Sequence, residues 1–487
     1  MPPAAADMHA AFHPFDWAIL ALYVLFLLLV GFWKRRQDTE DYLIASRSLS
    51  LPVFVATLVA TWYGGILGVG EFVYNDGLVA WLTNGLPYYV FALVFALFLA
   101  ARVRRAGASL YTIPDKLARE YDRKTALFGA FLAFVYASPS TYVLMQGTLL
   151  HILFGWPLLP AMVVGVLFSI IYVFRGGFLS DVRVNTLQFL LMFAGFAAIV
   201  GLCLARFGGL DYLRVPGRLP ATHLRLLGKY DLYFALVWFF IALVTLTDPG
   251  FHQRCYAART PRVAAVGILI AILCWMAFDA LTTTTGLFAR ALIPDLADAK
   301  MAFPALAERV LPPGAKGLFY VGMLAPIMAS TVSYTFIAAM TIGRDFIWRL
   351  QGERENLNVP AYTRLGLVAT SLLAILIALA IPSVVKQWYY LGSVFVPGIL
   401  IPLLGAYAPS PRWKAPANYA FLSMLLGASV ALGALLWGWT HGGYDDPHFP
   451  LGWQPMYPGL LIALCVYTAG LAAQRFCRSA HPQRPSE

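Results

Sequence analysis

The stretch Ala60-Thr61-Trp62-Tyr63-Gly64-Gly65 lies inside an apolar run, residues 51–74, and is followed by Gly68, Gly70 and Glu71. A run of this length can cross a membrane, because a spanning helix needs about 20 mostly apolar residues. Backbone groups in hydrocarbon must be hydrogen-bonded within the span, so paired glycines at its centre indicate a helix that breaks where protein surrounds it. The alternative is that these small residues only allow close packing between helices.

A second interruption lies in the apolar run at residues 232–251, where Trp238-Phe239-Phe240 leads into Thr245-Leu246-Thr247-Asp248-Pro249-Gly250. Proline lacks a backbone donor, and an acid followed by Pro-Gly ends or breaks a helix. Two broken helices at corresponding positions of two half-chains predict a transporter built from inverted repeats. With five spans in each half, the second half starts from the opposite side of the membrane, so the inversion follows from the count.

The composition of the whole chain indicates a membrane protein. Of its 487 residues, 60% are hydrophobic and 12% are charged, whereas soluble domains have about 25% charged residues. The chain cannot cover its surface with charge, which excludes a soluble protein. We therefore predict an all-α integral membrane protein with about 13 transmembrane helices. The apolar runs lie near 15–33, 51–74, 79–101, 126–154, 157–174, 184–205, 232–251, 263–289, 317–342, 363–385, 388–408, 417–439 and 457–474.

The positive charges predict how the chain is oriented in the cell membrane. Most of the 35 Lys and Arg residues lie in the loops after the odd-numbered runs and in the tail. The positive-inside rule makes that side cytoplasmic, so the N-terminus is expected outside and the C-terminus inside. Topology thus explains the net charge of +11 without a nucleic-acid partner. The absence of a basic residue before the first run argues against a cleaved signal peptide.

Motifs for other classes of protein are missing from the sequence. The five cysteines are scattered and the eight histidines form no HExxH pair, which argues against a metal centre or a disulfide framework. No nucleophile elbow or phosphate loop occurs, so an enzyme is not expected. A membrane sensor or channel on a transporter scaffold is a weaker alternative, since only residues 475–487 follow the last run.

Five sets of motif residues follow one another along the chain. They are Asp41-Tyr42-Leu43 with Ser46-Arg47-Ser48-Leu49; Tyr111-Thr112-Ile113-Pro114-Asp115; Gly176-Gly177-Phe178 with Gln188; Asp248-Pro249 with Gln253-Arg254 and Ala257-Ala258; and Leu324-Ala325-Pro326-Ile327-Met328-Ala329-Ser330-Thr331 with Arg344-Asp345. In this order they resemble the sodium:solute symporters, whose members carry proline, sugars, sialic acids, iodide and vitamins. The resemblance is collinear from about residue 38 to residue 410.

The resemblance implies a LeuT-like core of five plus five inverted helices, with one extra N-terminal helix and two extra C-terminal helices. The expected divisions are residues 1–48 for the outer N-terminus and first helix, 49–206 for the first repeat, 207–231 for an external loop, 232–410 for the second repeat and 411–487 for the last two helices and the cytoplasmic tail.

The resemblance also implies a sodium site, with backbone carbonyls at Ala60 and Tyr63 and further positions at Pro326, Ala329 and Ser330. A hard cation takes several oxygen ligands, and carbonyls with hydroxyls supply them without burying a charge. This chain departs from the family at Ala329, where a hydroxyl is usual. It departs again in the sixth run, where Val184-Asn185 replaces a Thr-Asp pair beside the ion's exit path.

These departures leave a proton as the alternative coupling ion. Intramembrane acids are costly unless they are paired or protonated, so each is a functional candidate. Asn185, Asp279 and Glu71 are the candidates for ion exit or coupling. The alternative for Asp279 is a buried acid hydrogen-bonded to the threonines that follow it. Asp248 is expected to cap the second broken helix.

The family's substrate contacts fall on Trp62, Gly64, Gly65, Asn84, Tyr88, Ile241 and Thr245. Their apolar and aromatic character disfavours a polyol, whose hydroxyls would lack partners. We predict a small, partly apolar organic solute or a carboxylate, the latter held by helix N-termini at the breaks. The alternative is that the aromatic residues only pack between helices.

Together these features predict a secondary active transporter that imports a small organic solute with sodium by alternating access. The main rival has the same fold but couples to protons or acts without coupling.

Overall fold

The structure is a computed structural model that describes residues 10–33, 38–107, 109–354, 357–444 and 447–480. Within these ranges the chain is helical, and its only bridge between extended residues joins Leu49 to Ala258. The helices are α1 (Pro14–Gly31), α2 (Thr39–Ile44), α3 (Leu51–Trp62), α4 (Ile66–Asp76), α5 (Val79–Asn84), α6 (Leu86–Val94), α7 (Ala101–Arg105), α8 (Ile113–Glu120), α9 (Arg123–Tyr136), α10 (Ser140–Phe154), α11 (Leu158–Phe207), α12 (Leu232–Ile241), α13 (Pro249–Ala257), α14 (Pro261–Leu292), α15 (Ala302–Val310), α16 (Ala315–Met340), α17 (Val359–Ala380), α18 (Val384–Ala406), α19 (Ala417–Gly442) and α20 (Met456–Ala480).

Short segments of other helical type join or extend these helices. Two are π-helical, η2 (Phe95–Ala100) and η6 (Thr341–Trp348). The others are 3₁₀ turns: η1 (Ala45–Arg47), η3 (Leu210–Arg214), η4 (Ala242–Leu246), η5 (Ala299–Met301), η7 (Pro411–Trp413) and η8 (Pro450–Gly452).

The predicted spans coincide with these helices. In the described part of the chain, 11 helices are long and apolar enough to cross a membrane, or 12 when α3 and α4 count as one bent span. The difference from the predicted 13 lies in α11, which is 50 residues long and contains both apolar runs at 157–174 and 184–205. At about 1.5 Å per residue it far exceeds the roughly 30 Å hydrocarbon core. Gly177 interrupts it with φ +56° and ψ −151°, between the two runs.

The first predicted break is present between α3 and α4, whose axes are bent by 59°. Two close approaches explain why glycines occupy it. A β-carbon on Gly64 would lie 2.3 Å from the side chain of Ser330, and one on Gly65 would lie 2.0 Å from the ring of Trp388. Both distances are far below van der Waals contact, so a larger residue at either position would displace α16 or α18.

The second predicted break is also present. The chain passes from α12 through the 3₁₀ turn η4 to Thr247, and α13 begins at Pro249. The Asp248 carboxylate accepts a hydrogen bond of 2.9 Å from the Phe251 backbone N–H. It therefore caps the N-terminus of α13, as the sequence predicts.

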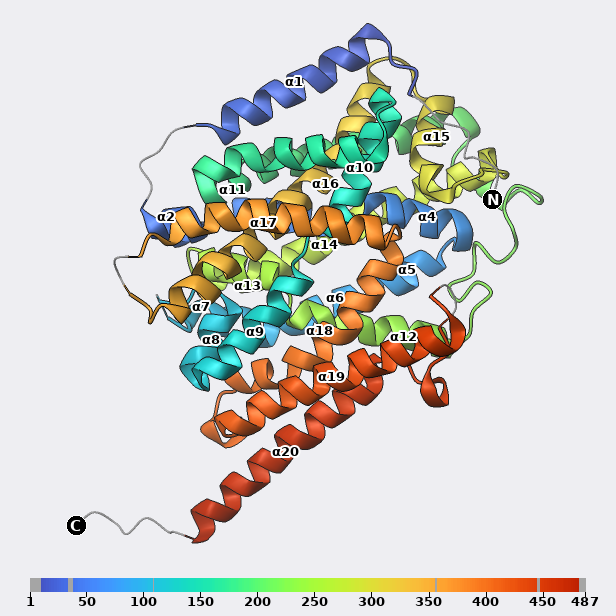
Figure 1. Cartoon of the computed structure of the whole chain (residues 1–487). Coiled ribbons are helices and arrows are strands. Elements are labelled where there is room, and N and C mark those ends of the chain that lie inside the picture. The colour runs from blue at the N-terminus through green and yellow to red at the C-terminus, as the bar shows by residue number, and fades with distance from the viewer. Residues whose placement is uncertain (1–9, 34–37, 108, 355–356, 445–446, 481–487) are drawn as a thin grey trace.

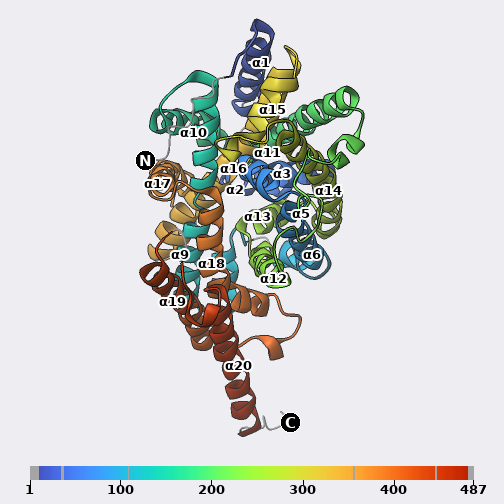
Figure 2. The ribbon, with the colours of Figure 1, turned by 90° about the vertical axis from the view of Figure 1, so that its right-hand side faces the viewer.

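Figures 1 and 2 show how the remaining helices surround the broken ones. α1 lies along one edge of the molecule and α19 with α20 lie along the opposite edge, while α3, α13, α14 and α16 occupy the space between. The apolar window of α16 is completely buried, whereas that of α20 is 28% buried. α16 is thus the central helix of the bundle, and its contacts include α3, α11 and α17.

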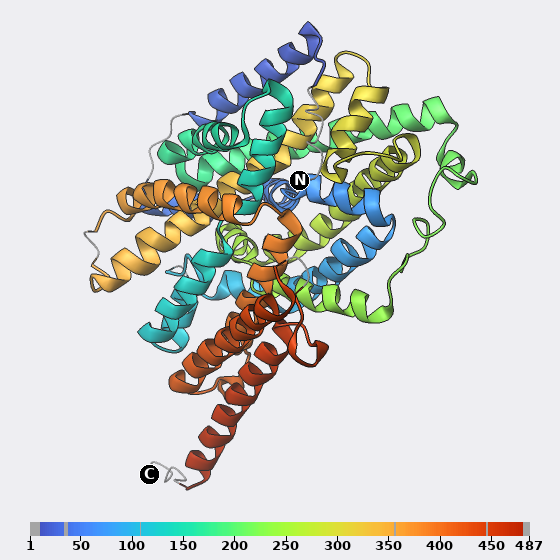
Figure 3. The same cartoon turned by 45° about the vertical axis from the view of Figure 1, so that its right-hand side comes forward.

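The loops lie at two ends of the bundle. In Figure 1, α2, α7 and α8 lie at the left-hand end, toward which α20 also runs. The connection from α11 to α12, residues 208–231, lies at the right-hand end and is drawn in green in Figure 3.

A cluster of charged side chains joins the helices at the end of the bundle that holds α2, α7 and α8. Asp115 of α8 receives hydrogen bonds from Arg344 at 2.8 Å and from Arg349 at 2.7 Å. Thr112 donates to Asp345 at 2.7 Å. These side chains fasten α8 to η6 and the residue after it.

Candidate functional site

A cavity of about 130 Å³ lies where the two breaks face each other. It is large enough for a small solute. Its walls come from α3, the α3–α4 break, α4, α5, α6, α9, α10, α12, η4, α14, α16 and α18. The lining residues are Trp62, Tyr63, Gly65, Val69, Asn84, Tyr88, Tyr89, Tyr136, Ser138, Thr141, Tyr142, Ile241, Val244, Trp275, Asp279, Tyr334, Trp388, Leu391 and Gly392.

The cavity contains most of the substrate contacts that the sequence predicts. Trp62, Gly65, Asn84, Tyr88 and Ile241 line it. The other two predicted contacts, Gly64 and Thr245, do not line it. Gly64 instead packs against Ser330 and Tyr142. Thr245 is buried, and its hydroxyl has no hydrogen-bond partner among the described residues.

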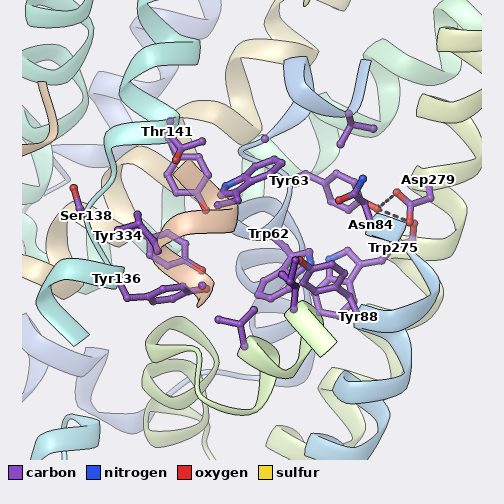
Figure 4. Close-up of a pocket in the computed structure, with 18 of the residues that line it drawn as sticks. Trp62, Tyr63, Asn84, Tyr88, Tyr136, Ser138, Thr141, Trp275, Asp279 and Tyr334 are labelled. Atoms are coloured by element: carbon purple, nitrogen blue, oxygen red, sulfur yellow. Dashed lines mark hydrogen bonds between the residues drawn. The ribbon is translucent and has the colours of Figure 1, made fainter. Parts of the chain in front are cut away.

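Sequence reasoning missed the wall that faces the first break. Tyr136 and Ser138 come from α9 and the turn after it, Tyr142 from α10, Tyr334 from α16 and Trp388 from α18. Figure 4 shows Tyr136, Ser138 and Tyr334 on one side and Asn84, Asp279 and Trp275 on the other. The only sequence signal was the Ser-Pro interruption of the run at 126–154, which marks a turn without showing what it faces.

Asp279 lies in the cavity wall and does not bond to the threonines that follow it. Its carboxylate accepts hydrogen bonds from the hydroxyls of Tyr63 and Tyr89, which Figure 4 marks with dashed lines. Thr282 donates instead to the Asp279 backbone carbonyl, at 3.2 Å. The acid thus connects the first break to α6 and α14.

The predicted sodium positions lie where α16 meets the first break. Ser330 is fully buried, and its hydroxyl donates to the Thr61 carbonyl at 2.7 Å and to the Pro326 carbonyl at 2.9 Å. Ala60 and Ala329 are also fully buried. Ser330 therefore bonds across to the break as well as within its own helix.

A second polar cluster joins Asn185 to Arg254 of the family motif and to Asp181, which the sequence analysis did not single out. Asn185 donates to Thr57 at 3.0 Å, and Ser333 donates to Asp181 at 2.6 Å. The Arg254 guanidinium donates to Ser333 at 3.1 Å and lies 3.9 Å from Asp181. Asp181 precedes Asn185 by four residues, so one helical turn separates them on the same face of α11.

This cluster is buried and only partly satisfied. One carboxylate oxygen of Asp181, the amide oxygen of Asn185 and Nε of Arg254 are buried without hydrogen-bond partners. Buried polar atoms rarely stay unpaired, so this cluster is a candidate position for a bound ion or water. Glu71, the third coupling candidate, lies on α4 outside the cavity lining.

The geometry defines a class of protein. Two helices broken around a shared cavity, inside a bundle of membrane-spanning helices, are the arrangement of secondary transporters with inverted repeats. The model of one family, described as the sodium:solute symporter family, matches residues 42–427. The chain belongs to the sodium:solute symporter family.

Individual proteins agree with this assignment. The chain is 23% identical to a high-affinity choline transporter of Caenorhabditis elegans, over 81% of this chain and 73% of the relative. It is 24% identical to the sodium/pantothenate symporter of Escherichia coli, over 92% and 94% of the two chains. Its fold matches that of a Na⁺-coupled sialic acid symporter in a substrate-bound, outward-open state, with a TM-score of 0.75, 15% identity, and coverage of 96% and 98%.

The chain is therefore a multi-pass membrane transporter and not an enzyme. It is a sodium-coupled symporter of a small-molecule solute. The prediction of an inverted-repeat fold of the LeuT type is confirmed by the structural match.

Proposed function

We propose that one sodium ion binds between the α3–α4 break and α16, with the carbonyls of Ala60, Tyr63 and Pro326, the Ala329 position and the Ser330 hydroxyl around it. The contact that supports this placement is the 2.7 Å hydrogen bond from Ser330 to the Thr61 carbonyl. It brings the α16 hydroxyl to the unwound backbone, where broken helices of transporters offer carbonyls to cations. Ala329 contributes no side-chain oxygen, so this site is expected to bind sodium weakly.

The solute binds in the adjacent cavity under this proposal. Tyr63 belongs to both sites, because its backbone is at the break and its hydroxyl donates to Asp279 in the cavity wall. Occupation of one site therefore orders part of the other, which gives cooperative binding of ion and solute. The relatives are named for choline and for pantothenate, so the family accepts solutes of either charge.

The ion leaves toward the cluster of Asp181, Asn185 and Ser333. Asp181 supplies the carboxylate that the Thr-Asp pair of the family would place at Asn185, one turn away on the same helix face. The neighbouring Arg254 carries a fixed positive charge, which disfavours long residence of a cation there.

We also propose the orientation and the division of the chain. The end of the bundle that holds α2, α7 and α8 is cytoplasmic, since the Lys and Arg residues gather there. Residues 49–206 and 232–410 form the two inverted repeats, with 207–231 between them outside the cell. Residues 1–48 and 411–487 add the flanking helices α1, α19 and α20.

A test needs purified protein and a panel of solutes. Thermal unfolding is recorded for amino acids, carboxylates, amines, nucleobases and vitamins, with and without sodium, and any ligand found is then used for uptake into proteoliposomes. We expect sodium and ligand to stabilise together by more than the sum of their separate effects. An imposed inward sodium gradient should drive accumulation.

The rival proposal couples transport to protons through Asp279. It predicts accumulation driven by a pH gradient in sodium-free buffer, and loss of that accumulation in Asp279→Asn with retained solute exchange. Undiminished uptake without sodium would contradict the sodium site proposed above.

A further inference from the structure

The charge balance of the cavity points to the kind of solute it holds. Among the described residues that line it, Asp279 is the only one with a charged side chain. A second acid lies directly behind the opposite wall, where Tyr334 donates to Asp248 at 2.8 Å. Arg254 is not among the lining residues, and its charge acts on Asp181 and Asp248, so it offsets those two acids and leaves Asp279 without a cationic partner among the described residues. The cavity therefore has an excess of negative charge.

The walls themselves favour a cation. Nine of the 19 lining residues are Trp or Tyr, and several rings meet edge to face, such as Trp62 with Tyr88 at 5.8 Å between centroids. The face of an aromatic ring is negative, so a cavity wall rich in Trp and Tyr can hold an ammonium group by cation–π contacts. An anion would gain no such contact and would lie near the Asp279 carboxylate.

The structure also weakens the case for a carboxylate solute. That expectation depended on helix N-termini at the two breaks. The N-terminus of α13 is already occupied, because the Asp248 carboxylate accepts the Phe251 N–H at 2.9 Å. One of the two positive ends is thus neutralised by the protein's own side chain.

The hydrogen-bonding groups distinguish between kinds of ammonium. A primary ammonium has three N–H donors that need acceptors. Asp279 already accepts hydrogen bonds from Tyr63 and Tyr89. A methylated ammonium has few or no donors, and its charge is spread over methyl groups that fit against rings. The cavity suits the second kind better.

Two unpaired groups indicate a polar part elsewhere in the solute. Trp275 is 1% exposed and Ser138 is 4% exposed, and both line the cavity. The indole N–H of Trp275 and the hydroxyl of Ser138 have no hydrogen-bond partner. Both groups can donate, so a hydroxyl or carbonyl oxygen on the solute would satisfy one of them.

From these observations we infer that the solute is a small organic cation, with a methylated ammonium group held by the aromatic walls and Asp279 and with an oxygen-bearing tail. This inference rests on the proposed function, since it assumes that the cavity is the transport site. Of the earlier expectation of a small, partly apolar organic solute or a carboxylate, it keeps the first part, gives that solute a positive charge and drops the carboxylate.

The test compares ligands that differ only in charge. Choline is measured against its neutral isostere, in which a tert-butyl group replaces the trimethylammonium group, and against the carboxylate that carries the same tert-butyl group. Binding to the full chain in nanodiscs is followed by tryptophan fluorescence and thermal unfolding, with sodium present. We expect choline to bind about tenfold or more tightly than the isostere, since a desolvated cation–π contact favours the charge, and the carboxylate to bind weakest.

Variants then show which residues cause the preference for a cation. Asp279→Asn should weaken the binding of choline about tenfold and that of the isostere much less, which removes most of the preference for charge. Trp62→Phe keeps an aromatic ring with a weaker negative face and serves if Asp279→Asn does not fold. Matched controls are Asp211→Asn and Trp437→Leu, whose residues are exposed and away from the cavity.

The outcomes separate this inference from the proposed function. The inference is overturned if the isostere or the carboxylate binds as tightly as choline or more tightly. It is also overturned if choline and tetramethylammonium fail to bind while a neutral or anionic solute binds with sodium. A chain that shows no response to sodium with any solute refutes the proposed function instead. Charge selectivity that survives in Asp279→Asn and in Trp62→Phe would place the cation elsewhere and also overturn the inference.

Discussion

Replacing Ser330 by alanine should weaken sodium binding more than it weakens the fold. The change removes the hydroxyl that donates to Thr61 and Pro326. Loss of ordinary hydrogen bonds costs about 0.5–1.5 kcal/mol of stability, whereas loss of a group that bonds a charge costs about 1.5–3 kcal/mol. Since about 1.4 kcal/mol is tenfold in affinity, the half-saturating sodium concentration should rise by about ten- to a hundredfold.

The measurement is the midpoint of thermal unfolding as sodium replaces potassium at constant ionic strength. Sodium that binds the folded state raises the midpoint in proportion to RT ln(1 + [Na⁺]/Kd), so the curve reports Kd without a known solute. Ser371→Ala is the matched control, because Ser371 is buried and its hydroxyl bonds only to its own helix, at the Leu367 carbonyl. It should lower the midpoint and leave the sodium response unchanged.

The reasoning is refuted if Ser330→Ala lowers the midpoint but gives the parental sodium curve. Ser330 would then be a structural hydroxyl that joins α16 to the break. The same conclusion follows if Ser371→Ala shifts the sodium response as far as Ser330→Ala does.

Three further predictions follow from particular contacts. Ala329→Ser should lower the half-saturating sodium concentration by a few-fold in the same titration, since it restores a hydroxyl beside Ser330; an unchanged curve would place the ion elsewhere. Gly65→Ala should cost about 1–3 kcal/mol of stability and weaken solute binding, because its β-carbon would lie 2.0 Å from the Trp388 ring; Gly433→Ala on α19, outside the cavity lining and with no atom within 4 Å of its β-carbon, is the control. Burial lowers the pKa of His223 below its ordinary 6.5. If Nδ1 became protonated, no acceptor would be present for its N–H among the described residues, because this atom is buried without a hydrogen-bond partner. The unfolded chain therefore binds a proton at His223 more readily than the folded chain does. The free energy of unfolding should be highest above about pH 6.5 and should decline as the pH falls below that value. His223→Gln should reduce this decline, which thermal unfolding at a series of pH values measures.

The sequence predicts the break positions well because their causes are local. Glycine pairs and an Asp-Pro-Gly step interrupt helices wherever they occur, and both interruptions are present in the structure. The two predicted spans at 157–174 and 184–205 are counted as one helix in the structure only because a kink at Gly177, and no loop, separates the two halves of α11.

The cavity was predicted only on the side that the breaks themselves form. Tyr136, Tyr334 and Trp388 are distant in sequence, and nothing in their local pattern shows that they face one space. Asp279 was singled out as an acid in a span, yet its partners Tyr63 and Tyr89 could not be inferred, because they depend on how α3, α6 and α14 pack. Asp181 was missed because the family motif directs attention to Asn185, one turn later.

The complete burial of α16 has a consequence for how the chain is made. A helix that leaves the insertion machinery is first surrounded by lipid, where Ser330 and Ser333 of α16 lack the Thr61 and Asp181 partners that they have in the bundle. Its neighbours α3 and α11 are synthesised earlier and form the surface that receives it. We expect α16 to insert poorly when it is expressed alone and efficiently after the preceding helices. The transport site would then assemble while the protein is being inserted into the membrane.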